Sequence, residues 1–320
     1  MTQGLVTVFE HEYLPVGDRL SPAQFEALAR FHDCKDDSLY SLGYKSVRFS
    51  SFVGILRVGN LTIEILPKTD TRERSADGPL WRNALCDMLA ACRKLRPRTL
   101  EKVRQSASSH SLLDVFIMQF LEEAESLVRL GLARRYRSDQ SNVMALKGRL
   151  LFAEQHSCNA IHAERWYTEH TVYDRDNPYN GIVRYALELL NGIAAPWMRD
   201  RIRALLLAFD GVSPFRPDAV FMERLRYSRN TEHYRDVLDL AWMIIKNQAP
   251  DLGSGRHDVF ALMFDMNRIF EEYVFRRLSL AGKRSSLRVE CRDDENRRIW
   301  RTMRLEPDIV ARHLLDDGSE

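Results

Sequence analysis

The sequence is poor in the features that mark several common classes of protein. Its net charge is only +2, from 47 basic and 45 acidic residues among 320, so overall charge does not indicate a nucleic-acid partner. Five cysteines are scattered without a Cys-x-x-Cys pair, which argues against a zinc site and against a disulfide framework. Reduced thiols fit a cytoplasmic protein best.

Targeting, membrane and nucleotide-binding motifs are also missing. The opening residues, MTQGLVTVFEHEY, contain no basic segment followed by an apolar run, so no signal peptide is predicted. No apolar stretch approaches the ~20 residues that span a bilayer, and we expect no membrane partner. The sequence has no Gly-x-x-x-x-Gly-Lys-Ser/Thr motif, so the chain is not expected to hydrolyse GTP itself.

The patterns that are present predict an α+β protein in three parts. Residues 1–75 form a β-rich domain, with strands at 46–49, 53–58 and 61–66 and a Gly59-Asn60 hairpin turn. Ser21 is the expected N-cap of a short helix over 21–32. Residues 76–250 form a helical middle domain, with helices expected at 112–130, ended by Gly131, and at 180–193, 198–209 and 234–245.

The last part, over residues 258–320, is predicted to be one helix followed by strands. The helix is expected over 259–281, with strands over 286–291 and about 298–312. Ten basic residues and four acidic ones lie between Arg276 and Arg304. Such an excess can neutralise phosphates, or it can be an ordinary solvated face, and the charge alone does not decide between them.

One cluster has metal-binding residue types without a metal-binding pattern. His156, Cys158 and His162 lie close together in the sequence, but no fourth ligand stands at a recognised zinc spacing. We interpret them as ordinary surface or core residues.

Five segments, taken in order, resemble the McrC family, whose members are the nuclease-bearing subunits of McrBC-type systems that restrict modified DNA. No single segment is specific, but five in the family's order are hard to obtain by chance. They are FVGILRVGNLTIEILPKTD from Phe52, the run Leu112–Phe152 with its Gly-Arg-Leu, DRDNPYNGIVRYALELL from Asp174, FDMNRIFEEYVFRRL from Phe264, and LEPDIV from Leu305.

The resemblance implies a C-terminal nuclease core of the PD-(D/E)xK type that works with Mg²⁺. Such a core holds the metal with converging carboxylates, because Mg²⁺ prefers hard oxygen ligands and activates water for phosphodiester hydrolysis. The matching residue is Asp308, after Pro307, and a helix acid would be Glu271, preferred over Glu272. Both Asp308 and Glu271 are expected to be catalytic and to bind the metal.

The second half of this motif is missing from the sequence. No acidic-x-Lys triplet follows Asp308, and Lys283 is the last lysine. The nuclease-like domain is therefore expected to be incomplete and C-terminally truncated. We expect that Mg²⁺ is not held productively and that this polypeptide does not cleave DNA alone.

The resemblance also implies a partner, a hexameric AAA+ GTPase ring of the McrB type, whose GTP hydrolysis such subunits stimulate. Candidate contact residues are Arg57 and Lys68 in the β-rich part, and Lys147 and Arg149 around Gly148. Three interpretations stay open: an endonuclease subunit acting on DNA that carries 5-methylcytosine, a non-catalytic adaptor or inactive remnant, and an α+β DNA-associated protein of another kind.

Overall fold

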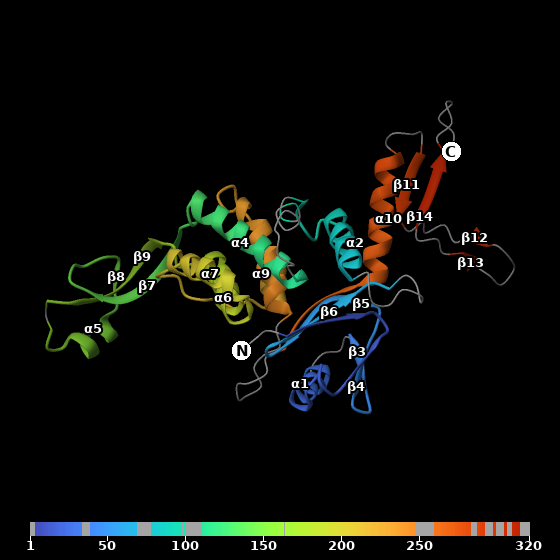
Figure 1. Ribbon diagram of the computed structural model, residues 1–320. Coiled ribbons are helices and arrows are strands. Elements are labelled where there is room, and N and C mark those ends of the chain that lie inside the picture. The colour runs from blue at the N-terminus through green and yellow to red at the C-terminus, as the bar shows by residue number, and fades with distance from the viewer. Residues whose placement is uncertain are drawn as a thin grey trace. The chain divides into compact units, whose positions relative to one another are not determined.

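The computed structural model divides the chain into two compact units, residues 1–119 together with 247–320, and residues 120–246 (Figure 1). The boundary between them falls within helix α4 (Leu112–Leu130). The structure describes residues 4–33, 39–68, 78–97, 99, 101, 111–162, 164–247, 259–282, 287–291, 297–298, 304–305 and 309–313. No helix in these ranges is long and apolar enough to cross a membrane.

The first unit is built on a four-stranded sheet in the order β1-β6-β5-β10. β1 runs parallel to β6, while β5 pairs antiparallel with both β6 and β10. Its strands are β1 (Gly4–Phe9), β5 (Phe52–Val58), β6 (Leu61–Leu66) and β10 (Val259–Asp265). The Gly59-Asn60 hairpin is confirmed, because Val58 pairs with Leu61 and Gly59 adopts a φ of 57°.

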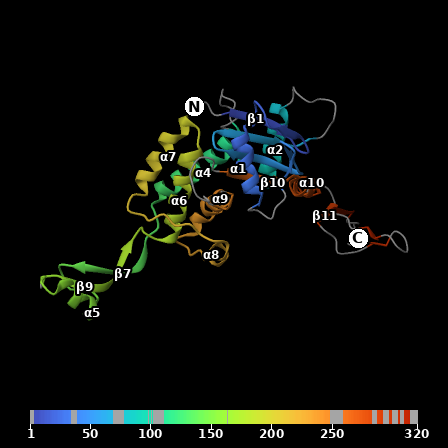
Figure 2. The same ribbon diagram turned by 90° about the horizontal axis from the view of Figure 1, so that it is seen from below.

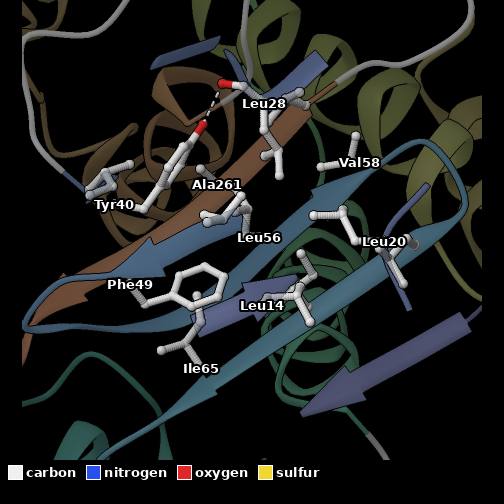
Figure 3. Packing of buried hydrophobic residues seen from close by; sticks show 14 of the residues in the cluster. Leu14, Leu20, Leu28, Tyr40, Phe49, Leu56, Val58, Ile65 and Ala261 are labelled. Carbon is white, nitrogen blue, oxygen red and sulfur yellow. Dashed lines mark hydrogen bonds between the residues drawn. The ribbon is translucent and has the colours of Figure 1, made fainter. Parts of the chain in front are cut away.

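One face of this sheet packs on a smaller sheet and a helix. The smaller sheet has the order β2-β4-β3, with strands β2 (Tyr13–Pro15), β3 (Tyr40–Gly43) and β4 (Ser46–Phe49). Helix α1 (Pro22–Asp33) closes the same core, and the Tyr40 hydroxyl donates to the carbonyl of Leu28 at 2.7 Å (Figure 3). Ser21 caps α1 as expected: its Oγ accepts from the amide of Gln24 at 3.3 Å, and its own amide donates to Gln24 Oε1.

The opposite face of the sheet is covered by helices, so β5 and β6 are buried on both sides. A buried ion pair fixes helix α2 (Gly78–Ala91) there: Arg82 Nε donates to Glu64 Oε1 at 2.7 Å, and Arg82 Nη2 donates to Glu64 Oε2. Phe116 of α4 stacks on Phe264 of β10. Helix α10 (Met266–Gly282) follows β10, and the carbonyl of its Ile269 accepts a hydrogen bond from the Cys92 thiol.

The predicted helix over 259–281 is wrong in its first seven residues, which form β10. The run VFALMFD is apolar throughout, and a short apolar run does not distinguish a buried strand from a buried helix. Pairing with β5 over seven positions, from Val259↔Val58 to Asp265↔Phe52, decides for the strand. The domain boundaries expected near 75 and 250 stay a prediction, although β10 ties residues 259–265 to the N-terminal sheet.

The remaining elements of the first unit are a pair of short antiparallel ladders. β11 (Leu287–Cys291) pairs with β14 (Ile309–His313), and β12 (Arg297–Arg298) pairs with β13 (Arg304–Leu305). The predicted strand over 286–291 is confirmed as β11. The single strand predicted over about 298–312 is wrong in its continuity, because its described residues belong to β12, β13 and β14, which lie in two different ladders.

The second unit combines a helical body with a projecting β arm (Figures 1 and 2). The helix over 112–130 is confirmed, and Gly131 follows it with a φ of 95°. The predicted helices at 180–193, 198–209 and 234–245 are confirmed within two residues at each end as α6, α7 and α9. The elements of the body are α6 (Pro178–Ile193), α7 (Pro196–Ala208), α8 (Ala219–Arg224), η1 (Glu232–Tyr234) and α9 (Arg235–Lys246).

Candidate functional site: the arm and its buried anchor

The arm consists of residues 135–174, which leave the helical body as two long strands. β7 (Arg135–Val143) pairs antiparallel with β9 (Trp166–Asp174) over nine positions, and the short β8 (Arg149–Leu150) adds to the far end of β9. Helix α5 (Phe152–Asn159) lies at the same end, away from the helices of the body (Figures 1 and 2). Among its described residues only Asn159 and Thr168 are buried, so the arm has no apolar core.

Side-chain amides hold the tip together in place of that core. Asn142 and Asn159 exchange hydrogen bonds of 2.8 and 2.9 Å between their amides. Gln155 Oε1 accepts from the backbone amide of Tyr167 at 2.6 Å and from Asn159, while its Nε2 donates to the carbonyl of Arg165. These bonds attach α5 to the strands and leave the apolar side chains of the tip outside.

The tip exposes a group of apolar side chains to solvent. Ile161 is 91% exposed and Phe152 is 78% exposed, and Met144 and Leu146 are exposed as well. Isolated exposed apolar residues are ordinary, but several at the end of one coreless arm indicate a surface that a partner covers.

Lys147 and Arg149, two of the predicted contact residues, lie on the turn of this tip. Gly148 between them has a φ of 66°, and a Cβ built on it would stand 2.3 Å from the carbonyl oxygen of Glu169. Only glycine fits this position, so it fixes how the two cations are presented. Arg149 is largely exposed, with Nε 3.7 Å from Glu169 Oε2, and Lys147 is exposed.

A buried hydrogen-bond hub anchors the root of the arm to the helical body. Asn180, fully buried on α6, donates from Nδ2 to the carbonyls of Ala133 and Arg175 at 2.9 and 2.7 Å. Its Oδ1 accepts from the hydroxyl of Tyr234 at 2.6 Å, and that hydroxyl accepts from the amide of Ala133. Residues 133 and 175 stand directly beside the two arm strands, so the hub fixes where the arm leaves the body.

Asn177 and Gly181 complete this anchor. Asn177 caps α6, accepting from the amide of Asn180, and its Nδ2 donates to the same two carbonyls, those of Ala133 and Arg175. A Cβ on Gly181 would lie 2.7 Å from the carbonyl oxygen of Ser213, so the close approach of residues 213–215 requires glycine. Burial raises the pKa of the hub's Tyr234 to about 12, which keeps its hydroxyl protonated as a donor.

The two contact residues predicted in the β-rich part are placed differently. Arg57 is 7% exposed within the central sheet, and its Nε donates to the carbonyl of Gly59 at 3.0 Å. Lys68 follows β6, with an exposed side chain and a backbone amide that donates to Glu10 Oε1. Burial suits Arg57 for holding the hairpin, whereas Lys147 and Arg149 are accessible.

Of the predicted nuclease carboxylates, the structure describes those on helix α10. Glu271 and Glu272 are half-buried on α10, and Glu272 accepts from Arg276 at 2.7 Å. Asp308 lies outside the described residues, immediately before β14, which pairs with the β11 strand that follows α10. In the described ranges no three His, Cys, Asp or Glu side chains come together as a metal site, and the Mg²⁺ site stays a prediction.

The remaining predicted features are the His/Cys cluster over 156–162 and the basic stretch over 276–304. His162 pairs with Glu164 at 3.1 Å, and Cys158 is a free, exposed thiol. Within the basic stretch, Arg276 pairs with Glu272, and the guanidinium of Arg277 lies over the ring of Tyr273. The structure describes no side chains over residues 283–304.

This geometry defines an α+β protein with a coreless arm suited to a partner. The family model of the McrBC 5-methylcytosine restriction system component matches residues 47–316. The chain therefore belongs to that family. The Type IV methyl-directed restriction enzyme EcoKMcrBC of Escherichia coli (strain K12) is 22% identical over 229 residues. That match covers 67% of this chain, and the chain spans 65% of the length of the relative.

Two solved assemblies from Thermococcus gammatolerans have a similar fold. One is a half-complex from a tetradecameric assembly of McrB AAA+ hexamers with bound McrC, with a TM-score of 0.70, 21% identity, and coverage of 97% of this chain and 77% of that chain. The other is a cryo-EM structure of the McrBC complex, with a TM-score of 0.61, 22% identity, and coverage of 86% of this chain and 87% of that chain. These likenesses confirm the α+β fold class.

Proposed function

We propose that this chain is the McrC-like subunit of a modification-dependent restriction system and that it docks on a McrB-type AAA+ GTPase ring through the tip of the arm. The observation that carries the proposal is the arm itself: nine paired positions, almost no buried residues, and a tip that combines exposed apolar side chains with Lys147 and Arg149. A related fold occurs in McrC bound to McrB hexamers, which supports the same kind of partner.

The tip supplies two kinds of contact. Phe152, Ile161, Met144 and Leu146 provide apolar area, which gives binding energy when it is removed from water. Arg149 provides a cation that a ring can use beside acidic groups or nucleotide phosphates, where an arginine stabilises the charge of the transition state. The Asn180 hub keeps the arm in one direction from the body, so the tip reaches its partner without first being ordered.

The experiment compares GTP turnover by a McrB-type ring with and without this chain. The native chain is expected to raise turnover. Arg149→Ala is expected to lower the stimulation at least about tenfold, since arginines that act on phosphoryl transfer contribute factors of that size or more. Ile161→Ser is expected to weaken docking, and a higher concentration of the chain should restore stimulation.

Arg203→Ala is the matched control, because Arg203 is an exposed arginine on α7, paired only loosely with Asp200 at 3.4 Å. If Arg203→Ala and Arg149→Ala lower stimulation equally, or if the folded native chain leaves turnover unchanged, docking through the tip is wrong.

We further propose that Asp308 and Glu271 belong to a Mg²⁺-dependent nuclease acting on DNA that carries 5-methylcytosine. The order α10, β11, β14, with Asp308 immediately before β14, supports this assignment. The alternative is a non-catalytic adaptor of the ring. Cleavage of methylated plasmid with the ring, GTP and Mg²⁺ separates them: cleavage lost in Asp308→Ala indicates the nuclease, and GTPase stimulation without cleavage indicates the adaptor.

A further inference from the structure

The small sheet β2-β4-β3 presents an outward face whose composition differs from the rest of the first unit. Alternate residues of its strands point inward, where Leu14, Tyr40 and Phe49 join the core (Figure 3). The residues between them point away from the core, because successive side chains of a strand face opposite sides. This outward face consists of Tyr13, Pro15, Ser41, Gly43, Ser46 and Arg48, with Tyr44 and Lys45 at the adjoining turn.

The face combines exposed aromatic rings with positive charge. Tyr44 is 92% exposed and Tyr13 is 58% exposed. Arg48 lies directly across from Tyr13 in the ladder and places its guanidinium 5.3 Å from the centre of that ring. Lys45 Nζ lies 5.7 Å from the centre of the Tyr44 ring. Each tyrosine therefore has a cation beside its ring.

Negative charge is missing from this face. Its described residues include two cations and no carboxylate, and the other positions carry small or uncharged side chains. The carboxylate nearest in the sequence, that of Glu12, accepts from the backbone amide of Phe9 at 2.8 Å. A face with cations and no carboxylate is complementary to a polyanion rather than to a protein surface that carries charges of both signs.

The turn that carries Tyr44 and Lys45 has a conformation that is unusual for its sequence. Lys45 has a φ of 50°, a left-handed backbone that glycine adopts more readily. Its carbonyl accepts from the amide of Val16 at 2.9 Å, which fixes the turn against the end of β2. A lysine at this position carries backbone strain that glycine would avoid, and such strain is concentrated at functional sites.

We propose that the outward face of β2-β4-β3 binds single-stranded DNA, with Tyr13 and Tyr44 stacking on bases and Lys45 and Arg48 contacting phosphates. Unpaired bases expose their flat faces and stack on aromatic side chains regardless of sequence, whereas the bases of a duplex are already stacked. Sequence-tolerant binding of this kind needs rings beside a positively charged track, which this face provides. The site lies in the first unit and is distinct from the arm, which belongs to residues 120–246.

The test is fluorescence anisotropy of the full chain with a labelled oligothymidylate of about 15 nucleotides, near the upper site size of one small β domain. Tyr13→Ala and Tyr44→Ala are each expected to weaken binding about five- to 100-fold, as loss of one stacked base does. Lys45→Gly, which the turn accepts, is expected to reduce the slope of log affinity against log salt by about 0.7.

Two exposed residues of the other unit serve as controls. Tyr136→Ala removes an exposed tyrosine of the arm, and Arg203→Ala removes an exposed arginine of α7, and both are expected to leave the affinity unchanged. The proposal is overturned if Tyr13→Ala and Tyr44→Ala bind within twofold of the native chain, or if Tyr136→Ala weakens binding equally. Equal binding of duplex without sensitivity to the tyrosines, or tighter binding of oligouridylate, would also overturn it. The binding assay contains no McrB-type GTPase, so its result is independent of GTPase stimulation.

Discussion

The buried ion pair between Glu64 and Arg82 is expected to stabilise the first unit strongly, and it can be tested on its own. The Glu64 side chain is fully buried in β6, while that of Arg82 is 18% exposed. Glu64 accepts two hydrogen bonds from Arg82 and one of 3.1 Å from the amide of Leu112. Arg82→Met therefore leaves a carboxylate in the protein interior with one amide donor.

Removing one partner of a buried pair costs about 3–5 kcal/mol, because the remaining charge is desolvated without compensation. We expect the lower end, about 3 kcal/mol, because water reaches part of Arg82. The double change Glu64→Gln with Arg82→Met should restore most of the loss, since it removes both charges and keeps an acceptor for Leu112. The side-chain hydrogen bonds to Glu64 and the charge of Glu64 also raise the pKa of the Arg82 guanidinium, in agreement with a strong pair.

Amide hydrogen exchange of β6, followed by mass spectrometry, measures this unit separately from the other. A loss of about 3 kcal/mol corresponds to exchange that is about 100-fold faster. The matched control is Arg201→Met, followed by amide exchange of its own helix α7, because Arg201 pairs with Glu125 at 2.6 Å with side chains 38% and 29% exposed, and such a pair contributes about 1 kcal/mol or less. If β6 exchange in Arg82→Met rises less than about fivefold, the argument from burial is refuted.

Three further predictions concern the arm and its anchor. Gly148→Ala should abolish GTPase stimulation without changing the thermal unfolding of the helical body, because its Cβ would meet the carbonyl of Glu169; stimulation within twofold of native would contradict this. Asn180→Ala should lower the free energy of unfolding by about 2–4 kcal/mol in urea, against about 1 kcal/mol for the capping residue Asn177→Ala. Tyr234 has its pKa raised from 10.0 to about 12, so its contribution to stability is complete below pH 10 and is lost as the pH rises through about 12. Melting temperatures at about pH 8 and 11 should therefore differ less in Tyr234→Phe than in the native chain; an equal difference would contradict the assignment.

Features with a local cause could be predicted from the sequence. The hairpin at Gly59-Asn60 follows from residues that tolerate the turn between two apolar runs. The helix over 112–130 follows from its apolar periodicity and from the glycine that ends it. The cap at Ser21 follows from a hydroxyl three residues before a glutamine, which satisfies both amides.

The arm was not predicted, because its strands lack the pattern that marks a strand. β7 reads RYRSDQSNV, with no alternation of apolar and polar residues, since neither of its faces packs on a core. The glycine between Lys147 and Arg149 indicates a turn that presents both cations, and the structure places them at the arm's tip. A signal for the anchor was present in the two asparagines of DNPYNG, but their partners at 133 and 234 are distant in the sequence.

Most helices and the hairpin of the central sheet could be predicted from local signals, because periodicity, caps and turns act over a few residues. Five segments in a fixed order indicated the family. Three features became clear in the folded chain alone: residues 259–265 are a strand, Arg57 is buried, and Asn180, Tyr234 and Ala133 meet in one hub. These depend on contacts between segments far apart in the chain, whose free energy no local window of residues contains.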